Sequence, residues 1–428
     1  MVASDQENGG LLAHRIEENL ARLPPSRADY WIVKLPDNFR SGTAYSFTPK
    51  IVSIGPLHHG EPRLQAMETH KMRYLNFCLW YNPNITVADL VESLNGLEEK
   101  VRGTYNQAHF PRTFSSEEFV TMMLLDGCFI VQLFIFNWNK GTAATYDPEM
   151  FATAFLFTSV KYDLNLAENQ LPFFLLEHLF NFILTDEQRG THSFFDVVAK
   201  YFNYYVKMGG NILSERTGDQ VKHLTDVLLN CFLPSTTYVV PSDKKRFDHL
   251  PTATELQKLG VRFKESENFN LLDITFINGV LAIPKITLSA STKSTFRNII
   301  AMENCHPGSK YYVTDYMILM NYLINTREDV GVLISSKVID SYFGNDEQVI
   351  QLFNSMRRGV IRNTTSSYYY GIIHELNVYS NRRWPRWKAQ AIEDYFQTPL
   401  TVLSLIGALS VLICTIVGAV FTVLSFTK

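Results

Sequence analysis

Phe119 to Trp138 reads Phe-Val-Thr-Met-Met-Leu-Leu-Asp-Gly-Cys-Phe-Ile-Val-Gln-Leu-Phe-Ile-Phe-Asn-Trp, and nearly every side chain in this stretch is apolar. Ser115 lies three positions before Glu118, the spacing of a capping box, so we predict that a helix begins here. A helix that is apolar on every side must be surrounded by protein or by lipid. Asp126, near the middle, would oppose insertion into a bilayer by roughly 2.5–3.5 kcal/mol. We therefore place this helix inside a protein core, where the Asp126 carboxyl needs a hydrogen-bonding partner.

Further helices are expected on both sides of this central one. Apolar residues recur at helical spacing from Arg63 to Tyr81 and from about Ile85 to Tyr105. Pro172 suits the first turn of an apolar helix from Phe173 to Leu184, because the missing N–H of a proline is not needed there. Later in the chain, helical patterns cover residues 294–305, 313–325, 345–358 and 388–396.

One segment has the period of a β-strand instead. Apolar and polar residues alternate from Leu271 to Ile277, Asn278-Gly279 follows, and Val280 to Leu288 returns, which is the pattern of a hairpin. Pro284 has no N–H to donate, so it ends the pairing or places the return strand at an edge. The sequence therefore predicts a mainly α fold with one small β-hairpin near residues 271–288.

Length and composition suggest a helical domain of two lobes. The chain has 428 residues, enough for two or three domains or one large one, and its 46% of apolar residues can bury a large core. A net charge of −3 and a pI near 6.4 argue against nucleic-acid binding, which needs a basic surface. We divide the chain into a polar N-terminal tail (1–44), an N-terminal helical lobe (45–235), a linker (236–250), a C-terminal lobe with the hairpin (251–398) and a terminal apolar segment (399–427).

The terminal segment has the length and composition of a transmembrane helix. No charged residue lies between Leu400 and Phe426. As a helix this run would be about 40 Å long, against a hydrocarbon core of ~30 Å. A buried core helix is the alternative, but the run is too long for one and lies at the end of the sequence. We expect residues 399–427 to cross a lipid bilayer.

Flanking residues predict the orientation of this span. Four cations and two tryptophans lie in Arg382-Arg383-Trp384-Pro385-Arg386-Trp387-Lys388, and such a flank usually faces the cytoplasm. The first residues lack the basic and apolar regions of a secretory signal. We therefore predict a tail anchor, inserted after synthesis, with residues 1–398 in the cytoplasm. The glycosylation triplets that begin at Asn84 and Asn363 would instead suit a lumenal body.

No catalytic or metal-binding motif is present. The sequence lacks the patterns of serine hydrolases, zinc proteases, nucleotide-binding loops and calcium loops. The cysteines are odd in number and far apart, which suggests reduced, buried thiols and no disulfide scaffold or zinc site. We therefore assign no catalytic, cofactor-binding or metal-binding residue. The cysteines are Cys78, Cys128, Cys231, Cys305 and Cys414.

Three fragments could nevertheless carry chemistry. His58-His59-Gly60 could ligate a metal, although adjacent histidines on an extended segment point to opposite faces. Asp126-Gly127-Cys128 could pair with His58 or His70 as a nucleophile and base, although an apolar environment makes a thiol unreactive. Glu68 and Lys71 could be an acid and base, but a surface ion pair on a helix is the commoner arrangement.

Several ordered motifs resemble one plant family, domain of unknown function 247. The resemblance covers about residues 45–428 and implies a plant protein with a C-terminal membrane anchor and no established enzymatic activity. In grasses, members of this family are the proposed male determinants at the two self-incompatibility loci. The motifs are Ser53-Ile54-Gly55-Pro56-Leu57-His58-His59-Gly60, Met67-Glu68-Thr69-His70-Lys71-Met72-Arg73-Tyr74-Leu75, Met122 to Ile130, Glu168-Asn169-Gln170-Leu171-Pro172-Phe173-Phe174, Ala253-Thr254-Glu255-Leu256, the hairpin Leu271–Ile286, and Phe296-Arg297-Asn298.

Two hypotheses of function follow. In the first, the chain is a membrane-anchored, non-enzymatic recognition protein that binds the bilayer through residues 399–427, binds unidentified proteins and binds no nucleic acid. Its specificity would lie on exposed loops, for example residues 103–113, 139–147 and 186–192. In the second, it is a membrane-bound enzyme built on His58, His59, Asp126 and Cys128. Convergence of these four side chains in one pocket would favour the enzyme.

Overall fold

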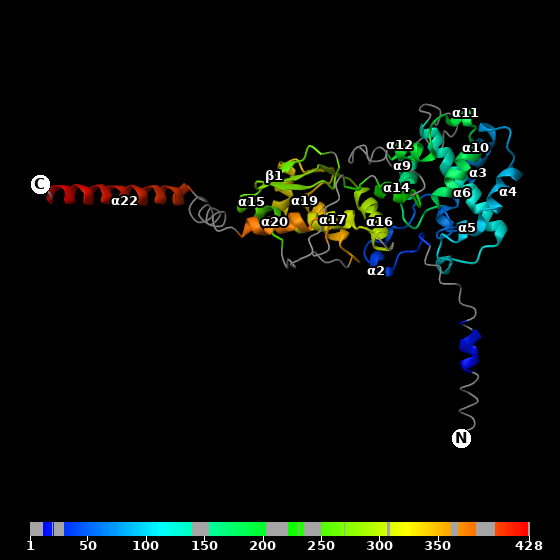
Figure 1. Cartoon of the computed structure of the whole chain (residues 1–428), viewed down its shortest axis with the longest axis horizontal. Helices are drawn as coiled ribbons and strands as arrows, with labels where there is room; N and C mark the ends of the chain where they lie inside the picture. Colours follow the sequence, from blue (N-terminus) through cyan, green and yellow to red (C-terminus); the bar gives the residue numbers. More distant parts are fainter. Residues whose placement is uncertain are drawn as a thin grey trace, which may run out of the picture.

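The computed structural model describes most of the chain between Tyr30 and Ser380, together with two terminal helices (Figure 1). Helices make up 61% of the structure and strands 6%, so the prediction of a mainly α fold is confirmed. The predicted linker 236–250, apart from its last residue, and the predicted helix 388–396 lie outside the described residues. These are residues 12–18, 20, 30–138, 154–202, 221–230, 232–234, 250–268, 270–305, 309–360, 367–381 and 399–426.

The apolar stretch from Phe119 to Trp138 lies in the central helix of the N-terminal half. It forms α6, Ser116–Trp138, and the predicted capping box is present, because the Ser115 N–H donates to Glu118 and the Glu118 N–H donates to the Ser115 hydroxyl. Within the described residues α6 alone is long and apolar enough to cross a membrane, yet 89% of its apolar window is buried by protein. It is a core helix, as Asp126 suggested.

Other helices of this half pack around α6. Helix α3 makes the most extensive contact with α6, and α4, α10 and α12 also pack against α6 (Figure 1). The predicted helix over about 85–105 is two helices, α4 and α5, which a turn at Gly96 separates. The helices of this half are α2 (Asp37–Arg40), α3 (Ala66–Tyr81), α4 (Val87–Asn95), α5 (Glu98–Arg102), α9 (Ala154–Asp163), α10 (Phe173–Ile183), α11 (Asp186–Arg189), α12 (Phe194–Tyr201) and α14 (Leu224–Asn230), with 3-10 turns η1 (Ala44–Ser46), η2 (Pro62–Leu64) and η3 (Gln107–His109).

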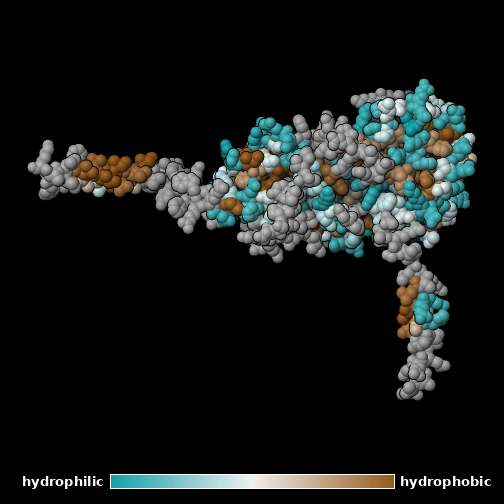
Figure 2. Space-filling model, in the orientation of Figure 1, coloured by the Kyte–Doolittle hydropathy of each residue, from teal (hydrophilic) through white to brown (hydrophobic). Residues whose placement is uncertain are grey.

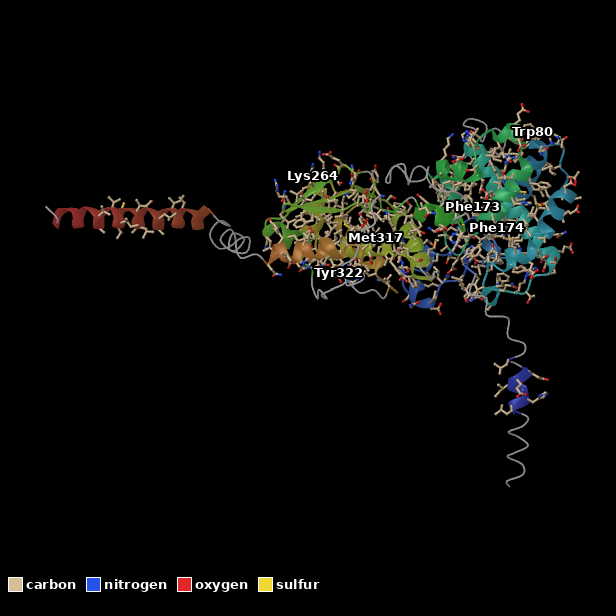
Figure 3. All side chains as sticks on the ribbon, in the orientation of Figure 1. Trp80, Phe173, Phe174, Lys264, Met317 and Tyr322 are labelled. Carbon is tan, nitrogen blue, oxygen red and sulfur yellow. The ribbon has the colours of Figure 1, made fainter. Side chains whose placement is uncertain are left out.

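The C-terminal half lies beside the first along the long axis of the body (Figure 1). Helices α16, α17 and α19 pack on one another, and α18 lies between α15 and α19. Figure 3 shows that side chains fill both halves, with Phe173 and Met317 inside and Trp80 exposed at the outer edge. The elements are α15 (Ala253–Lys258), α16 (Thr292–Cys305), α17 (Tyr312–Leu323), α18 (Arg327–Ser335), α19 (Asp346–Met356) and α20 (Tyr370–Ser380), with strands β1 (Arg262–Glu265), β2 (Thr275–Ile277), β3 (Val280–Ile283), β4 (Ile286–Leu288) and β5 (Ile339–Ser341).

The predicted hairpin is present, but it is part of a larger arrangement. Strands β2 and β3 pair antiparallel around Asn278-Gly279, both of which have positive φ, as a tight hairpin turn requires. Strand β3 ends just before Pro284, as expected. The sequence did not predict that β1 pairs parallel with β3, or that β4 pairs parallel with β5. These strands have only three or four residues, too few to show a clear period.

The predicted polar tail 1–44 is too long. Ile32, Leu35 and Phe39 are buried, and residues 30–60 run across both halves of the body. Polar residues lie between these apolar ones, so the average composition of the segment did not indicate that part of it is buried. Further out, residues 12–18 form a helix with exposed Leu12 and Ile16 on one side. In Figure 2 this helix has one hydrophobic and one hydrophilic face.

One hydrophobic core serves both halves. Its buried side chains form a continuous cluster that runs from Ile32 through Phe129 and Phe296 to Leu376. The body surface is a mixture of polar and apolar patches (Figure 2). The two halves are therefore described as parts of one packed body, with the N-terminal segment as a shared element.

Helix α18 ends in a strained residue, which gives a prediction about stability. Lys337 has a φ of 61°, its N–H donates to Ile334 O, and the Val338 N–H donates to Leu333 O, which is a Schellman motif. Gly260 ends α15 with the same bonds and a φ of 90°. Because glycine adopts this conformation without steric strain, we expect Lys337→Gly to raise the free energy of unfolding by about 0.5–1 kcal/mol.

Urea unfolding followed by tryptophan fluorescence would measure this change. Lys337→Ala removes the same charge but keeps the Cβ, so it should give no such gain. Gly260→Ala should lower stability by about 1 kcal/mol, because it introduces the strain that Lys337 already has. An equal gain for Lys337→Gly and Lys337→Ala would contradict the conformational explanation.

Candidate functional site

The motif around His58 lies in a turn, and the His58 ring lies between two carboxylates. Residues 56–60 form turns and no extended strand, contrary to the expectation for this segment. The buried His58 has Nδ1 2.8 Å from Glu61 Oε1 and Nε2 3.3 Å from Glu168 Oε2. His59 is half-buried and meets the ring of Phe114 edge-on. The two histidines therefore have different neighbours.

Glu168 ties the N-terminal segment to the body. Its buried carboxylate pairs with Arg40 and accepts the Leu35 N–H at 2.8 Å. Burial raises the pKa of this carboxyl, but His58, Arg40 and the backbone donor outweigh burial and hold the pKa below its ordinary value. Glu168 therefore remains charged. Its partners lie between Leu35 and His58, and it does not cap the nearby helix α10.

Asp126 finds its partner in Lys71. The ammonium of Lys71 lies 2.6 Å from Asp126 Oδ1 and 2.7 Å from Glu68 Oε1, and its side chain has no exposed surface. The sequence suggested a surface ion pair of Glu68 and Lys71. The structure instead makes this pair part of a triad in which Lys71 and Asp126 are buried and Glu68 is partly exposed. Burial lowers the pKa of Lys71, yet the two carboxylates outweigh burial and raise it. Burial raises the pKa of Asp126, and the cation of Lys71 opposes this effect, so we take the pair as ionised.

The same triad holds the turn at Gly55. Asp126 Oδ2 accepts the Gly55 N–H at 2.8 Å. Gly55 has a φ of 71°, and a Cβ there would lie 2.7 Å from the backbone oxygen of Gln170. Just before this turn, the Asp163 carboxylate accepts the N–H groups of residues 50–52, and Asn169 accepts the N–H of Ile54. The side chains of Asp126, Asp163 and Asn169 therefore hold one backbone segment, residues 50–55, in place.

Cys128 lies in the core. It has no exposed surface, and the thiol of Cys78 contacts its backbone oxygen at 3.9 Å. Burial raises the pKa of the Cys78 thiol well above its ordinary value. The contacts of His58 go to Glu61 and Glu168, whereas those of Asp126 go to Lys71 and Gly55, so the structure gives no pocket shared by the residues of the enzyme hypothesis. In the described part of the chain, no group of three or more potential ligands is placed to hold a metal ion.

A buried carboxyl of the C-terminal half was not anticipated. Glu303, near the end of α16, accepts the N–H groups of Val313 and Thr314 and the Thr314 hydroxyl, all within 2.9 Å. It thus caps the start of α17. Burial raises its pKa to about 7, although these donors work in the opposite direction. Arg297, six residues earlier on α16, donates to backbone oxygens of Phe39, Met356 and Arg358 and so joins α16 to the N-terminal segment and to the end of α19.

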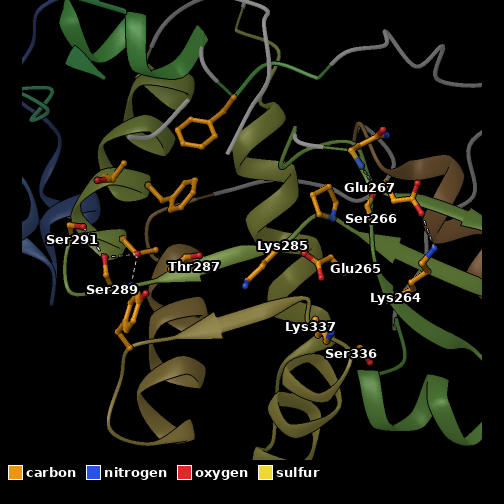
Figure 4. A pocket seen from close by; sticks show the side chains of 17 residues that line it. Lys264, Glu265, Ser266, Glu267, Lys285, Thr287, Ser289, Ser291, Ser336 and Lys337 are labelled. Carbon is orange, nitrogen blue, oxygen red and sulfur yellow. Dashed lines mark hydrogen bonds and ion pairs between the residues drawn. The ribbon is translucent and has the colours of Figure 1, made fainter. Parts of the chain in front are cut away.

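A cavity of about 1030 Å³ opens in the C-terminal half (Figure 4). It lies between β1, β4 and the start of α16, and this volume is at the upper end of typical ligand pockets. Its charges are mixed: Lys264 lies 3.4 Å from Glu267, and Lys285 lies 3.1 Å from Asp340. Hydroxyls of Ser289, Ser291 and Thr292 hydrogen-bond to one another on its opposite side.

The C-terminal helix α22, Pro399–Phe426, is apolar on all sides. Side chains are described from Ile406 to Val420, and consecutive residues are all exposed, for example Val411 (67%), Leu412 (55%) and Ile413 (59%). Figure 2 shows this part as a continuous hydrophobic surface. The apolar helix described here has 15 residues, shorter than the ~20 that a bilayer core requires, so the predicted span is not confirmed by this length.

With this geometry established, the chain can be compared with known proteins. Residues 32–414 match the family DUF247, which is described as "Plant protein of unknown function". The chain belongs to this plant family. The DUF247 match begins at residue 32, in agreement with the burial of Ile32, and not at residue 45 as the motifs alone suggested.

Two relatives from Arabidopsis thaliana support the DUF247 membership. UPF0481 protein At3g47200 is 28% identical over 421 residues, which cover 92% of this chain and 86% of the relative. Putative UPF0481 protein At3g02645 is 22% identical over 461 residues, which cover 86% of this chain and 85% of the relative. No solved structure shows significant similarity to the chain. The family and its relatives carry no assigned activity in these descriptions.

Proposed function

We propose that this DUF247 protein is a membrane-anchored recognition protein that binds partner proteins and catalyses no reaction. The observation that carries the proposal is α22, a helix whose apolar side chains are exposed around its whole circumference (Figure 3). Exposed apolar surface of this kind is unfavourable in water and is typical of a lipid or protein contact. The charge-free run from Leu400 to Phe426 extends beyond the described side chains and is long enough for a bilayer.

The buried polar groups support a non-enzymatic role. The charged side chains that resembled catalytic candidates have partners that fix the backbone: Asp126 holds Gly55, and Glu168 holds Leu35. A catalytic acid or base needs access to a substrate. Asp126 and Cys128 are fully buried and have none.

Membrane flotation of the full chain tests the anchor. We expect wild type to float with vesicles after a carbonate wash. Ile413→Lys with Val417→Lys should abolish flotation, because each lysine at the centre of a span opposes insertion by about 2.5–3.5 kcal/mol. Ile413→Leu with Val417→Leu is the matched control and should float like wild type. Wild-type protein that stays soluble without detergent would refute the anchor.

The same membrane-bound protein can be used to test on which side of the membrane the body lies. We place the body, residues 1–398, in the cytoplasm because the basic segment 382–388 precedes the anchor. Asn84 is exposed and begins a glycosylation triplet. A mobility shift on endoglycosidase treatment that Asn84→Gln abolishes would place the body in the lumen and overturn the cytoplasmic placement.

Recognition itself would lie on exposed loops of the N-terminal half. Of the three loops considered, 186–192 is largely exposed, and 103–113 is exposed only in part, because Thr104 and Tyr105 are buried. The third, 139–147, lies outside the described residues. Because grass members of this family are proposed self-incompatibility determinants, we further propose that the partner acts in self-incompatibility. Proximity labelling of the anchored protein in pollen and in leaf tests this: a partner set specific to pollen supports it, and identical sets in both tissues contradict it.

A further inference from the structure

A second cleft lies where the N-terminal segment meets the C-terminal half. Its volume is about 360 Å³. The turn before α16, which carries Ser289 and Ser291 in Figure 4, borders it through Ala290. The polar residues that matter for its chemistry are Tyr45, Ser46 and Lys50 from the N-terminal segment, Lys293 and Ser294 from the first turn of α16, and Gln348 from α19.

The cleft has two cations and, among the described residues that line it, no carboxylate. The Lys293 ammonium donates to the Tyr45 hydroxyl and lies 4.9 Å from the centre of that ring, so its structural partner is neutral. Lys50 is exposed, and Asp163 accepts its backbone N–H. The Lys50 ammonium also acts on the Asp163 carboxyl through its charge, which opposes the rise that burial causes in the pKa of that carboxyl. A concave surface with charges of one sign concentrates counter-ions.

Neutral donors complete the lining. Ser46 is fully buried, and its hydroxyl has no hydrogen-bond partner among the described residues. The Gln348 side-chain oxygen accepts the Gly344 N–H, which leaves the amide N–H₂ of Gln348 as the free end. The first turn of α16 adds the partial positive charge of a helix start. The cleft thus presents several potential donors to an anion.

We propose that this cleft binds the phosphate group of a small phosphomonoester, such as a sugar phosphate. Two ammonium groups match the double negative charge of a phosphomonoester, and the volume is near the lower end of small-molecule pockets. The larger cavity of Figure 4 suits an anion less well, because Glu267 and Asp340 already pair with two of its lysines. This inference is independent of the membrane anchor and of the protein partner.

Calorimetry on the full chain in non-ionic detergent tests the proposal. Glucose 6-phosphate and inorganic phosphate should bind, glucose should not, and the affinity should fall as the salt concentration rises from 50 to 200 mM. Lys50→Gln with Lys293→Gln should weaken binding at least tenfold. Lys310→Gln, which removes an exposed lysine outside the cleft, should leave it unchanged.

Chemical footprinting of wild-type protein gives a test that does not depend on a folded variant. We expect saturating glucose 6-phosphate to protect Lys50 and Lys293 from acetic anhydride, read by mass spectrometry, while Lys310 is modified as before. Absence of binding at millimolar probe, full binding by the double variant, or equal modification of all three lysines with and without probe would each overturn the proposal.

Discussion

Replacing Lys71 by methionine should lower the free energy of unfolding by about 3–5 kcal/mol, the range found when one partner of a buried ion pair is removed. Methionine fills nearly the same space, so the loss reports on charge and not on a cavity. The carboxylate of Asp126, which is fully buried, would lose the cation 2.6 Å away. Urea unfolding of the variant and of wild type would measure the difference.

A surface pair provides the matched control. Arg112 and Glu118 lie 2.9 Å apart with both side chains about half exposed, so Arg112→Met should change stability by less than about 1 kcal/mol. Adding Asp126→Asn to Lys71→Met should recover most of the loss, because the asparagine oxygen can still accept the Gly55 N–H and carries no charge. A double variant that is less stable than Lys71→Met alone would contradict the charge argument.

The Lys71→Met defect should also depend on pH. Without its cation, the buried Asp126 has a folded-state pKa raised by desolvation above the unfolded value of roughly 3.9. A raised carboxyl pKa gives stability that is complete below the unfolded pKa and is lost as the pH rises through the folded pKa. The variant should therefore lose stability relative to wild type as the pH rises from 4 to 7.5, and the Lys71→Met, Asp126→Asn double variant should not show this additional loss. The comparison with wild type removes the contribution of Glu303, whose raised pKa is common to all three proteins.

Gly55→Ala should lower stability by about 2–4 kcal/mol, because it combines backbone strain with a clash that cannot relax easily. The new Cβ would lie 2.7 Å from the Gln170 backbone oxygen and 3.1 Å from the Tyr105 hydroxyl. The turn would have to move away from Gln170 to remove this clash. The hydrogen bond from the Gly55 N–H to Asp126 would then be lost. Thermal unfolding and urea unfolding both report this loss.

Gly60→Ala separates the two contributions. Gly60 has a φ of 84°, so alanine there is strained in the same way, but nothing lies within 4 Å of the added Cβ. We expect it to destabilise the protein by only about 1 kcal/mol. Equal losses for Gly55→Ala and Gly60→Ala would show that the close approach at Gly55 adds nothing.

Local features of this fold could be predicted from the sequence, because their causes lie within a few residues. The capping box at Ser115 and Glu118 and the turn at Asn278-Gly279 are examples. The need of Asp126 for a partner was also visible, since a carboxylate in an apolar helix cannot remain alone. The sequence did not identify its partner, because Glu68 is three residues from Lys71 and offered a local explanation for that lysine.

What the sequence could not show are contacts between distant segments. Asp126 lies on another helix than Lys71, and Lys50 and Lys293 of the phosphate cleft come from opposite halves of the chain. Pairing of β1 with β3 and of β4 with β5 depends on how the helices between them fold back. Motif resemblance marked Arg297 and Glu168 without giving their partners. Several of these partners are N-terminal residues first taken for a tail, namely Phe39 for Arg297 and Leu35 and Arg40 for Glu168.

The long reach of the N-terminal segment bears on the order in which the protein is made. Arg297 donates to Phe39 across 258 positions, and Asn298 donates to Ser46 across 252. The ribosome releases Phe39 and Ser46 early, yet their partners are synthesised only after more than half the chain has emerged. Contacts of such high sequence separation form slowly. Phe39 and Ser46 therefore wait for their α16 partners through more than half of translation, and we expect this part of the N-terminal segment to dock late.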